Sequence, residues 1–143
     1  MDLRLGSLAI LGALALFGAV ASKVRTEPPE LPAPERAMAV DLTVNETARR
    51  GGKREVRLRL EPGSPQIIGR SSDAAVGVLD PEVSRRHASL RAVGGVVYLA
   101  DLGSVNGTFL SGKRAGTDGI EVLAGDVIDV GTTRMTVSAI EPA

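Results

Sequence analysis

The 143-residue chain contains no cysteine, no tryptophan, two phenylalanines and one tyrosine. Without cysteine it cannot form disulfides, zinc–thiolate sites or a thiol nucleophile. With so few aromatic residues, any core must consist of Val, Leu, Ile and Ala. The chain has a single histidine and neither an HExxH nor a GxxxxGK[ST] pattern, so it carries no recognisable catalytic or nucleotide-binding motif, and none of its carboxylates stands in one. We expect a protein that is not an enzyme and needs no cofactor or metal.

An excess of charge of either sign is also missing. The chain has 17 Lys and Arg against 17 Asp and Glu, so its formal net charge is zero. Proteins that bind the phosphate backbone of nucleic acids normally carry a basic excess. The balance therefore argues against a nucleic-acid partner, although a local cluster of arginines is still compatible with it.

The N-terminal region contains a long uncharged stretch. Residues 5–22 have the sequence LGSLAILGALALFGAVAS, without a charged side chain. As a helix this stretch is about 27 Å long, close to the roughly 30 Å thickness of the hydrocarbon core of a bilayer. We expect residues 1–22 to form a transmembrane helix that contacts the membrane through residues 5–22.

A secretory signal peptide is the competing interpretation of the same region. Arg4 precedes the apolar stretch, and residues 19–21 (AVA) resemble an A-x-A cleavage site. Lys23 and Arg25, however, follow the stretch directly, and such cations favour retention of the C-terminal side in the cytoplasm. We therefore expect an uncleaved single-pass anchor in the cell membrane, with the rest of the chain on the cytoplasmic side.

Residues 23–37 contain four prolines among charged residues. Because proline fixes φ and removes a backbone donor, this composition predicts an extended, semi-rigid linker. Thr26 lies between Arg25 and Glu27, so phosphorylation by a kinase and recognition by a neighbouring copy are conceivable. An unmodified linker threonine is the simpler interpretation.

From residue 38 onward, apolar and polar residues alternate. The alternation is clearest in residues 40–44, 56–60, 88–92 and 135–139. A period of two places one side chain in a core and the next in water, as in antiparallel sheets. Turns that contain glycine or proline separate these stretches. We expect residues 38–143 to form one nearly all-β domain, a sandwich or a barrel.

Four short motifs follow one another within this domain. They are Gly69-Arg70, Ser84-Arg85-Arg86-His87, the stretch DLGSVNGT at residues 101–108 and LAGD at residues 123–126. Each alone has a simple structural explanation; Asn106-Gly107, for example, predicts a type I′ hairpin turn. Together, their order and spacing resemble the forkhead-associated (FHA) domain over about residues 56–140. The resemblance implies an FHA-like β-sandwich of about eleven strands, whose loops at one end bind a phosphothreonine peptide.

The residue types in these motifs suit a phosphate ligand. A phosphate monoester carries nearly two negative charges and three acceptor oxygens at neutral pH. Arg70 offers a planar fork that can bond two of those oxygens, and Ser84 offers a hydroxyl donor. Arg85 adds a second charge, and Asn106 can clamp a peptide backbone because its amide both donates and accepts. We expect all four residues to lie on loops.

The resemblance implies supporting roles for neighbouring residues. Gly69, Gly107 and Thr108 are expected to shape the backbone of the pocket. His87 is expected to tie the phosphate-binding loop to neighbouring backbone rather than to act in acid–base chemistry. Asp101 is expected to pin a loop, with contact to the peptide as the alternative.

Val105 also belongs to the expected phosphopeptide-binding set, and it departs from the family pattern. Many members of the family have threonine at this position. Valine keeps a similar volume but lacks a hydroxyl that can help to bind phosphate, so we expect weaker binding. A preference for phosphothreonine over phosphoserine needs an apolar niche for the γ-methyl group, which the sequence does not show.

Two functions remain after these arguments. The first is a membrane-tethered signalling adaptor that recruits a threonine-phosphorylated protein or peptide. The alternative is a structural FHA-like interaction domain of a membrane assembly that packs without phosphate. Such structural domains tend to lose the phosphate-binding residues, and this chain keeps Arg70, Ser84 and Asn106. ATP-dependent kinases make phosphothreonine in the cytoplasm, which by analogy agrees with the expected orientation.

Overall fold

A computed structural model describes residues 35–47 and 52–143 of the chain. These residues form eleven strands and no helix. The expected transmembrane helix, most of the linker and Thr26 lie outside the described residues. Among the residues that the structure does describe, no helix is long and apolar enough to cross a membrane.

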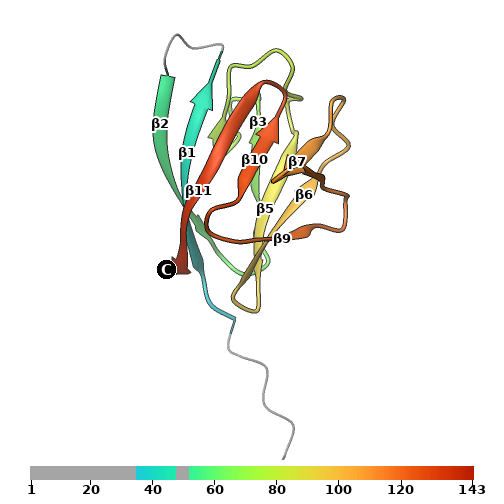
Figure 1. Cartoon of the computed structure of the whole chain (residues 1–143). Coiled ribbons are helices and arrows are strands. Elements are labelled where there is room, and N and C mark those ends of the chain that lie inside the picture. The colour runs from blue at the N-terminus through green and yellow to red at the C-terminus, as the bar shows by residue number, and fades with distance from the viewer. Residues whose placement is uncertain (1–34, 48–51) are drawn as a thin grey trace, which may run out of the picture. The chain divides into compact units, whose positions relative to one another are not determined.

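The strands form two sheets that pack face to face (Figure 1). Their bounds are β1 Met38–Glu46, β2 Gly52–Leu60, β3 Gln66–Gly69, β4 Val76–Gly77, β5 Ala88–Val93, β6 Val96–Asp101, β7 Thr108–Leu110, β8 Lys113–Arg114, β9 Ile120–Val122, β10 Val127–Val130 and β11 Thr133–Pro142. The strand order is β2-β1-β11-β10-β7-β8 in one sheet and β4-β3-β5-β6-β9 in the other. The pairs are antiparallel except β3–β4, which is parallel. This architecture confirms the expected all-β sandwich of about eleven strands.

The core lies between the sheets and is built from the alternating stretches. The four stretches expected from the sequence are parts of β1, β2, β5 and β11. In β1, for example, Val40, Leu42 and Val44 are at most 1% exposed, whereas the residues between them are at least partly exposed. Full burial of one such aliphatic side chain stabilises the fold by about 1.5–3 kcal/mol. The core cluster of the described residues consists of Val, Leu, Ile and Ala, as the scarcity of aromatic residues predicts, together with Met38 and Met135.

The prediction of a type I′ hairpin turn at Asn106-Gly107 is wrong. Gly107 has a positive φ of 86°, but Asn106 does not, and the strands on either side belong to different sheets. A two-residue hairpin turn instead joins β7 to β8 at Ser111 (φ 48°) and Gly112 (φ 84°). Residues 102–107 are consequently a loop that crosses from one sheet to the other.

Candidate functional site

Three loops meet at one end of the sandwich. They comprise residues 70–75 between β3 and β4, residues 78–87 between β4 and β5, and residues 102–107 between β6 and β7 (Figure 1). They border a surface depression of about 290 Å³. Its lining consists of Arg70, Pro81, Glu82, Val83, Ser84, Arg85, Val105 and Asn106. The fold thus brings together all five residues that the sequence predicts to bind a phosphopeptide.

Arg70 follows β3 directly, and hydrogen bonds fix its orientation. Its Nε donates to the carbonyl oxygen of Val83 at 2.6 Å, and its backbone N–H donates to the carbonyl oxygen of Ser84 at 3.1 Å. Within the described residues, no hydrogen bond or ion pair engages the two terminal nitrogens of its guanidinium group. A guanidinium held in this way can bond two oxygens of one phosphate without first breaking a bond inside the protein.

Ser84 holds its hydroxyl in a position that suits donation to a ligand. Its Oγ accepts a hydrogen bond from the backbone N–H of Val105 at 3.2 Å. Because a hydroxyl carries one hydrogen and can also accept, its own hydrogen remains available to a ligand oxygen. Arg85 follows in the chain with an exposed side chain, and its carbonyl oxygen accepts from the backbone N–H of Ser71 at 3.0 Å. The site therefore carries a second cation close to this hydroxyl.

Gly69 lets the first two loops approach each other closely. A Cβ at this position would lie 2.1 Å from the carbonyl oxygen of Arg85 and 3.0 Å from that of Ser84. Both contacts are with backbone, which cannot move aside as a flexible side chain could. The absence of a side chain at Gly69 thus permits the backbone hydrogen bonds that hold Arg70 next to Ser84.

His87 is fully buried and links two of the loops. Its Nδ1 accepts from the backbone N–H of Ser84 at 3.0 Å, and its Nε2 lies 2.8 Å from the carbonyl oxygen of Gly107. Since Nδ1 is an acceptor, the proton of the neutral ring is on Nε2, which donates to that carbonyl. Both ring nitrogens are therefore engaged inside the protein, where they position the backbone on either side of the depression.

Asp101 organises the loop of residues 102–107. Its carboxylate accepts from the hydroxyls of Ser104 (2.6 Å) and Thr108 (2.7 Å) and from the backbone N–H groups of Gly103 (3.0 Å) and Ser104 (3.1 Å). The Oγ of Ser104 in turn accepts from the N–H of Gly107 at 2.9 Å. Burial raises the pKa of Asp101, but these hydrogen bonds outweigh burial and hold the pKa below its ordinary value. Both carboxylate oxygens thus bind the loop, as expected for a residue that pins it.

Asp80 has a similar role in the loop of residues 78–87, and no sequence motif points to it. The residue is 1% exposed, and its Oδ2 accepts from the N–H and the hydroxyl of Thr132 (both 2.8 Å) and from the hydroxyl of Thr133 (2.9 Å). Its Oδ1 accepts from the N–H of Glu82 at 2.9 Å. Burial raises the pKa of Asp80, but the hydrogen bonds from Thr132, Glu82 and Thr133 outweigh burial and lower it. Asp80 thus fixes this loop to the turn between β10 and β11.

Glu82 is a second residue that the sequence reasoning missed, and it contacts Asn106. The Nδ2 of Asn106 donates to the carbonyl oxygen of Glu82 at 2.8 Å and lies 3.4 Å from its Oε2. Within the described part of the chain, the Oδ1 of Asn106 takes part in no hydrogen bond. The amide is therefore held by its donor end and presents its acceptor, which could receive an N–H from a peptide backbone.

Comparisons with known proteins agree with this geometry. The family model described as "FHA domain" matches residues 67–131. The FHA domain-containing protein FhaB of Mycolicibacterium smegmatis is 36% identical over 98 residues, which cover 68% of this chain and 59% of FhaB. The chain thus spans little more than half the length of that curated relative.

Solved structures show the same likeness. The FhaA FHA domain, complexed with the intracellular domain of Rv3910, is 33% identical with a TM-score of 0.58, and the match covers 71% of this chain and 99% of that domain. An FHA domain studied for phosphothreonine-dependent interactions is 34% identical with a TM-score of 0.58, and the match covers 72% of this chain and 99% of that domain.

Proposed function

Because the chain belongs to the FHA domain family, we propose that it is an adaptor that binds a threonine-phosphorylated protein or peptide and catalyses no reaction. The observation that carries this proposal is the pairing of Arg70 with Ser84. Among the residues that the structure describes, nothing engages the two terminal nitrogens of this guanidinium group, which is held through Nε. The hydroxyl lines the same depression with its hydrogen available. The phosphate group of a phosphothreonine offers three acceptor oxygens and nearly two negative charges, which match these donors.

The remaining residues of the depression supplement this pair. Arg85 supplies a second positive charge, and the Oδ1 of Asn106 accepts an N–H from the backbone of the bound peptide. Each charge-assisted hydrogen bond to the phosphate contributes about 1.5–3 kcal/mol. Val105 presents an 86% exposed apolar side chain at the rim, where a hydroxyl would add one more donor.

The membrane attachment is part of the same proposal. Residues 1–22 form a single-pass anchor that crosses the cell membrane through residues 5–22. Residues 23–37 form the linker, and residues 38–143 form the FHA domain on the cytoplasmic side. Support comes from the uncharged length of residues 5–22, from Lys23 and Arg25, and from the intracellular partner of the related FhaA domain.

The absence of cysteine offers a direct test of this topology. A single cysteine placed at the exposed position Ser138 (Ser138→Cys) gives the chain one reactive thiol. We expect a membrane-impermeant maleimide to label this variant after lysis but not in intact cells, and we expect the protein in the membrane fraction. Labelling in intact cells, or recovery without the membranes, would contradict the proposed attachment.

Phosphate-dependent binding is tested by titrating the full chain, in detergent micelles, with a degenerate phosphothreonine peptide library and its unphosphorylated counterpart. We expect binding that needs the phosphate and weakens at least about thirtyfold in Arg70→Ala. The matched control is Arg59→Ala, because Arg59 is an exposed arginine of β2 that pairs with Glu61. A folded chain whose binding does not depend on the phosphate would overturn the proposal in favour of the structural role in a membrane assembly. The missing hydroxyl at Val105 would then be the first cause to examine.

A further inference from the structure

An apolar depression adjoins the candidate phosphate site. Its lining consists of Arg70, Val78, Leu79 and Pro81, and it shares Arg70 and Pro81 with the depression described above. Val78 belongs to the core at 1% exposure, whereas the side chain of Leu79 is 61% exposed. Arg70 therefore lies where a polar depression and an apolar depression meet.

The backbone holds Leu79 firmly in place. The N–H of Val78 donates to the carbonyl oxygen of Gly69 at 3.0 Å. Asp80, on the other side, is fixed by Thr132 and the adjacent threonine. Because the residues before and after Leu79 are both anchored, contact with a ligand there costs little ordering of the chain.

An exposed leucine by itself is ordinary on a protein surface. Leu123 is 60% exposed and lines a different depression together with Met38 and Gly95. What distinguishes Leu79 is its position beside Arg70. Because Arg70 and Pro81 line both depressions, a peptide whose phosphate is bound by Arg70 has the apolar depression next to it.

We propose that Leu79, Val78 and Pro81 form a subsite that selects an aliphatic side chain of the phosphorylated target. This subsite rests on the proposed function, because the bound phosphate places the peptide. An extended peptide advances by about 3.3 Å per residue, so the selected side chain is one of the nearest few neighbours of the phosphothreonine. A polar side chain there would lose water against aliphatic walls, and Arg70, the polar residue of the lining, is engaged by the phosphate.

The test compares the full chain, Leu79→Ser and the matched control Leu123→Ser, all in detergent micelles, against a degenerate phosphothreonine peptide library. We expect the unaltered chain and Leu123→Ser to enrich aliphatic residues at one fixed distance from the phosphothreonine. In a single selected peptide, replacing that residue by serine weakens binding about tenfold. Leu79→Ser loses this preference but still requires the phosphate.

The possible outcomes separate the subsite from the proposed function. The subsite is overturned if binding depends on the phosphate but no aliphatic position is enriched, or if Leu79→Ser keeps the same aliphatic preference. In both cases the proposed binding of phosphothreonine still holds. If the unaltered chain binds phosphorylated and unphosphorylated peptides equally well, both the subsite and the proposed function are overturned. Thermal unfolding of the three proteins checks that they are equally folded, which we expect because both leucines are exposed.

Discussion

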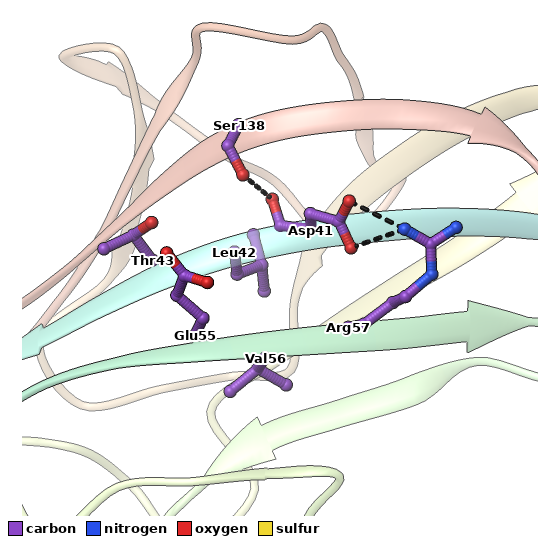
Figure 2. A pocket seen from close by; sticks show the side chains of 7 residues that line it. All are labelled: Asp41, Leu42, Thr43, Glu55, Val56, Arg57 and Ser138. Carbon is purple, nitrogen blue, oxygen red and sulfur yellow. Dashed lines mark hydrogen bonds and ion pairs between the residues drawn. The ribbon is translucent and has the colours of Figure 1, made fainter.

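Two depressions of this domain each contain an exposed arginine, and they differ in which groups bind that arginine. On the solvent-facing side of β1, β2 and β11 (Figure 2), one terminal nitrogen of Arg57 bonds both oxygens of Asp41 at 3.0 and 2.8 Å. Its other terminal nitrogen bonds Glu141 at 2.6 Å. At the three-loop site, among the described residues, Arg70 is bonded through Nε to a carbonyl oxygen and leaves both terminal nitrogens unengaged. The proposed phosphate site therefore differs from the sheet face in the terminal nitrogens of Arg70, which are free of bonds to the described residues, and not in positive charge alone.

The carboxylates around the two arginines account for the difference. The hydrogen bond to Glu141 and the charge of Asp41 raise the pKa of Arg57, so its partners already stabilise its charge. Glu82 is the carboxylate that lines the three-loop site, and its Oε2 lies 3.4 Å from the Nδ2 of Asn106. A phosphate that reaches Arg70 thus displaces no carboxylate of the described residues.

The largest effect is expected from Gly69→Ala. This substitution would displace the backbone of Ser84 and Arg85, so that Arg70 is no longer held beside Ser84 with its terminal nitrogens free for a ligand. A Cβ at 2.1 Å from a backbone oxygen forces the loops apart. We expect the free energy of unfolding to fall by about 1–3 kcal/mol, and phosphopeptide affinity to fall at least about thirtyfold because the charge-assisted bonds are misplaced. Denaturant unfolding and peptide titration measure the two changes.

The matched control for this variant is Gly77→Ala in β4. The nearest atom to a Cβ at Gly77 is the backbone oxygen of Ser71 at 4.0 Å, an ordinary contact. We expect this variant to fold and bind like the unaltered chain. Unchanged binding in Gly69→Ala would show that the close approach of the loops does not position Arg70.

Acid should weaken the three-loop site more than the sheet face, because two carboxylates that accept several hydrogen bonds hold its loops. The pKa values of Asp80 and Asp101 are lowered in the folded protein. Each carboxylate therefore stabilises the fold above the unfolded pKa of about 3.9, and this contribution is lost as the pH falls below about 4 towards the lowered folded value.

The variant Asp101→Asn tests this pH dependence. We expect it to lower the free energy of unfolding at pH 7 by about 1–3 kcal/mol, and to make stability depend less on pH between 7 and 3. Denaturation at several pH values measures both. Asp118→Asn serves as the control because the Asp118 side chain is exposed. A variant at Asp101 with the pH dependence of the unaltered chain would refute the account of the loop.

A smaller effect is expected from Val105→Thr, which adds a hydroxyl donor to the three-loop site and leaves the sheet face unchanged. The N–H of Val105 donates to the Oγ of Ser84, so the backbone of Val105 already lies beside the hydroxyl that we propose binds phosphate. One added hydrogen bond should raise phosphopeptide affinity about three- to tenfold. Val93→Thr, at an exposed valine of β5, should change nothing. Equal affinity in Val105→Thr would mean that this side chain does not face the phosphate.

The smallest effect is expected from Arg57→Ala on the sheet face. Exposed ion pairs contribute at most about 1 kcal/mol each, and Arg57 lies outside the site. We expect a slight loss of stability in a thermal melt and unchanged phosphopeptide affinity. A clear loss of affinity would place the ligand on the sheet face instead of the three loops.

The sequence predicted those parts of the fold that depend on local pattern. Alternation in β1 and β11 makes one side of each strand apolar, which requires a second sheet to cover it. The motifs around Gly69, Ser84 and Asn106 are separated in the chain, and their resemblance to one family predicted that they meet.

Contacts that depend on distant residues were not predictable in this way. The hydrogen bonds of Asp80 reach Thr132 and Thr133, which lie 52 and 53 positions further along the chain. In the sequence, an Asp before a proline cannot be told from the Asp of an ordinary surface turn. The orientation of Arg70 depends on the carbonyl oxygen of Val83, a group that every residue possesses. The turn prediction at Asn106-Gly107 failed for a related reason: tertiary contacts of Gly107 with His87 replace the local hairpin.

The most direct test of the central claim follows the arginine side chains themselves. The full chain, labelled with ¹⁵N in detergent micelles, is titrated with one library-selected phosphothreonine peptide and with its unphosphorylated twin. The arginine Nε–H and the backbone N–H resonances are recorded. We predict that the phosphorylated peptide shifts the resonances of Arg70 and of the Ser84 backbone N–H, that its twin does not, and that Arg57 stays unchanged with both. Shifts at Arg57 instead of Arg70, or equal shifts with both peptides, would contradict the assignment of the three-loop site to phosphate.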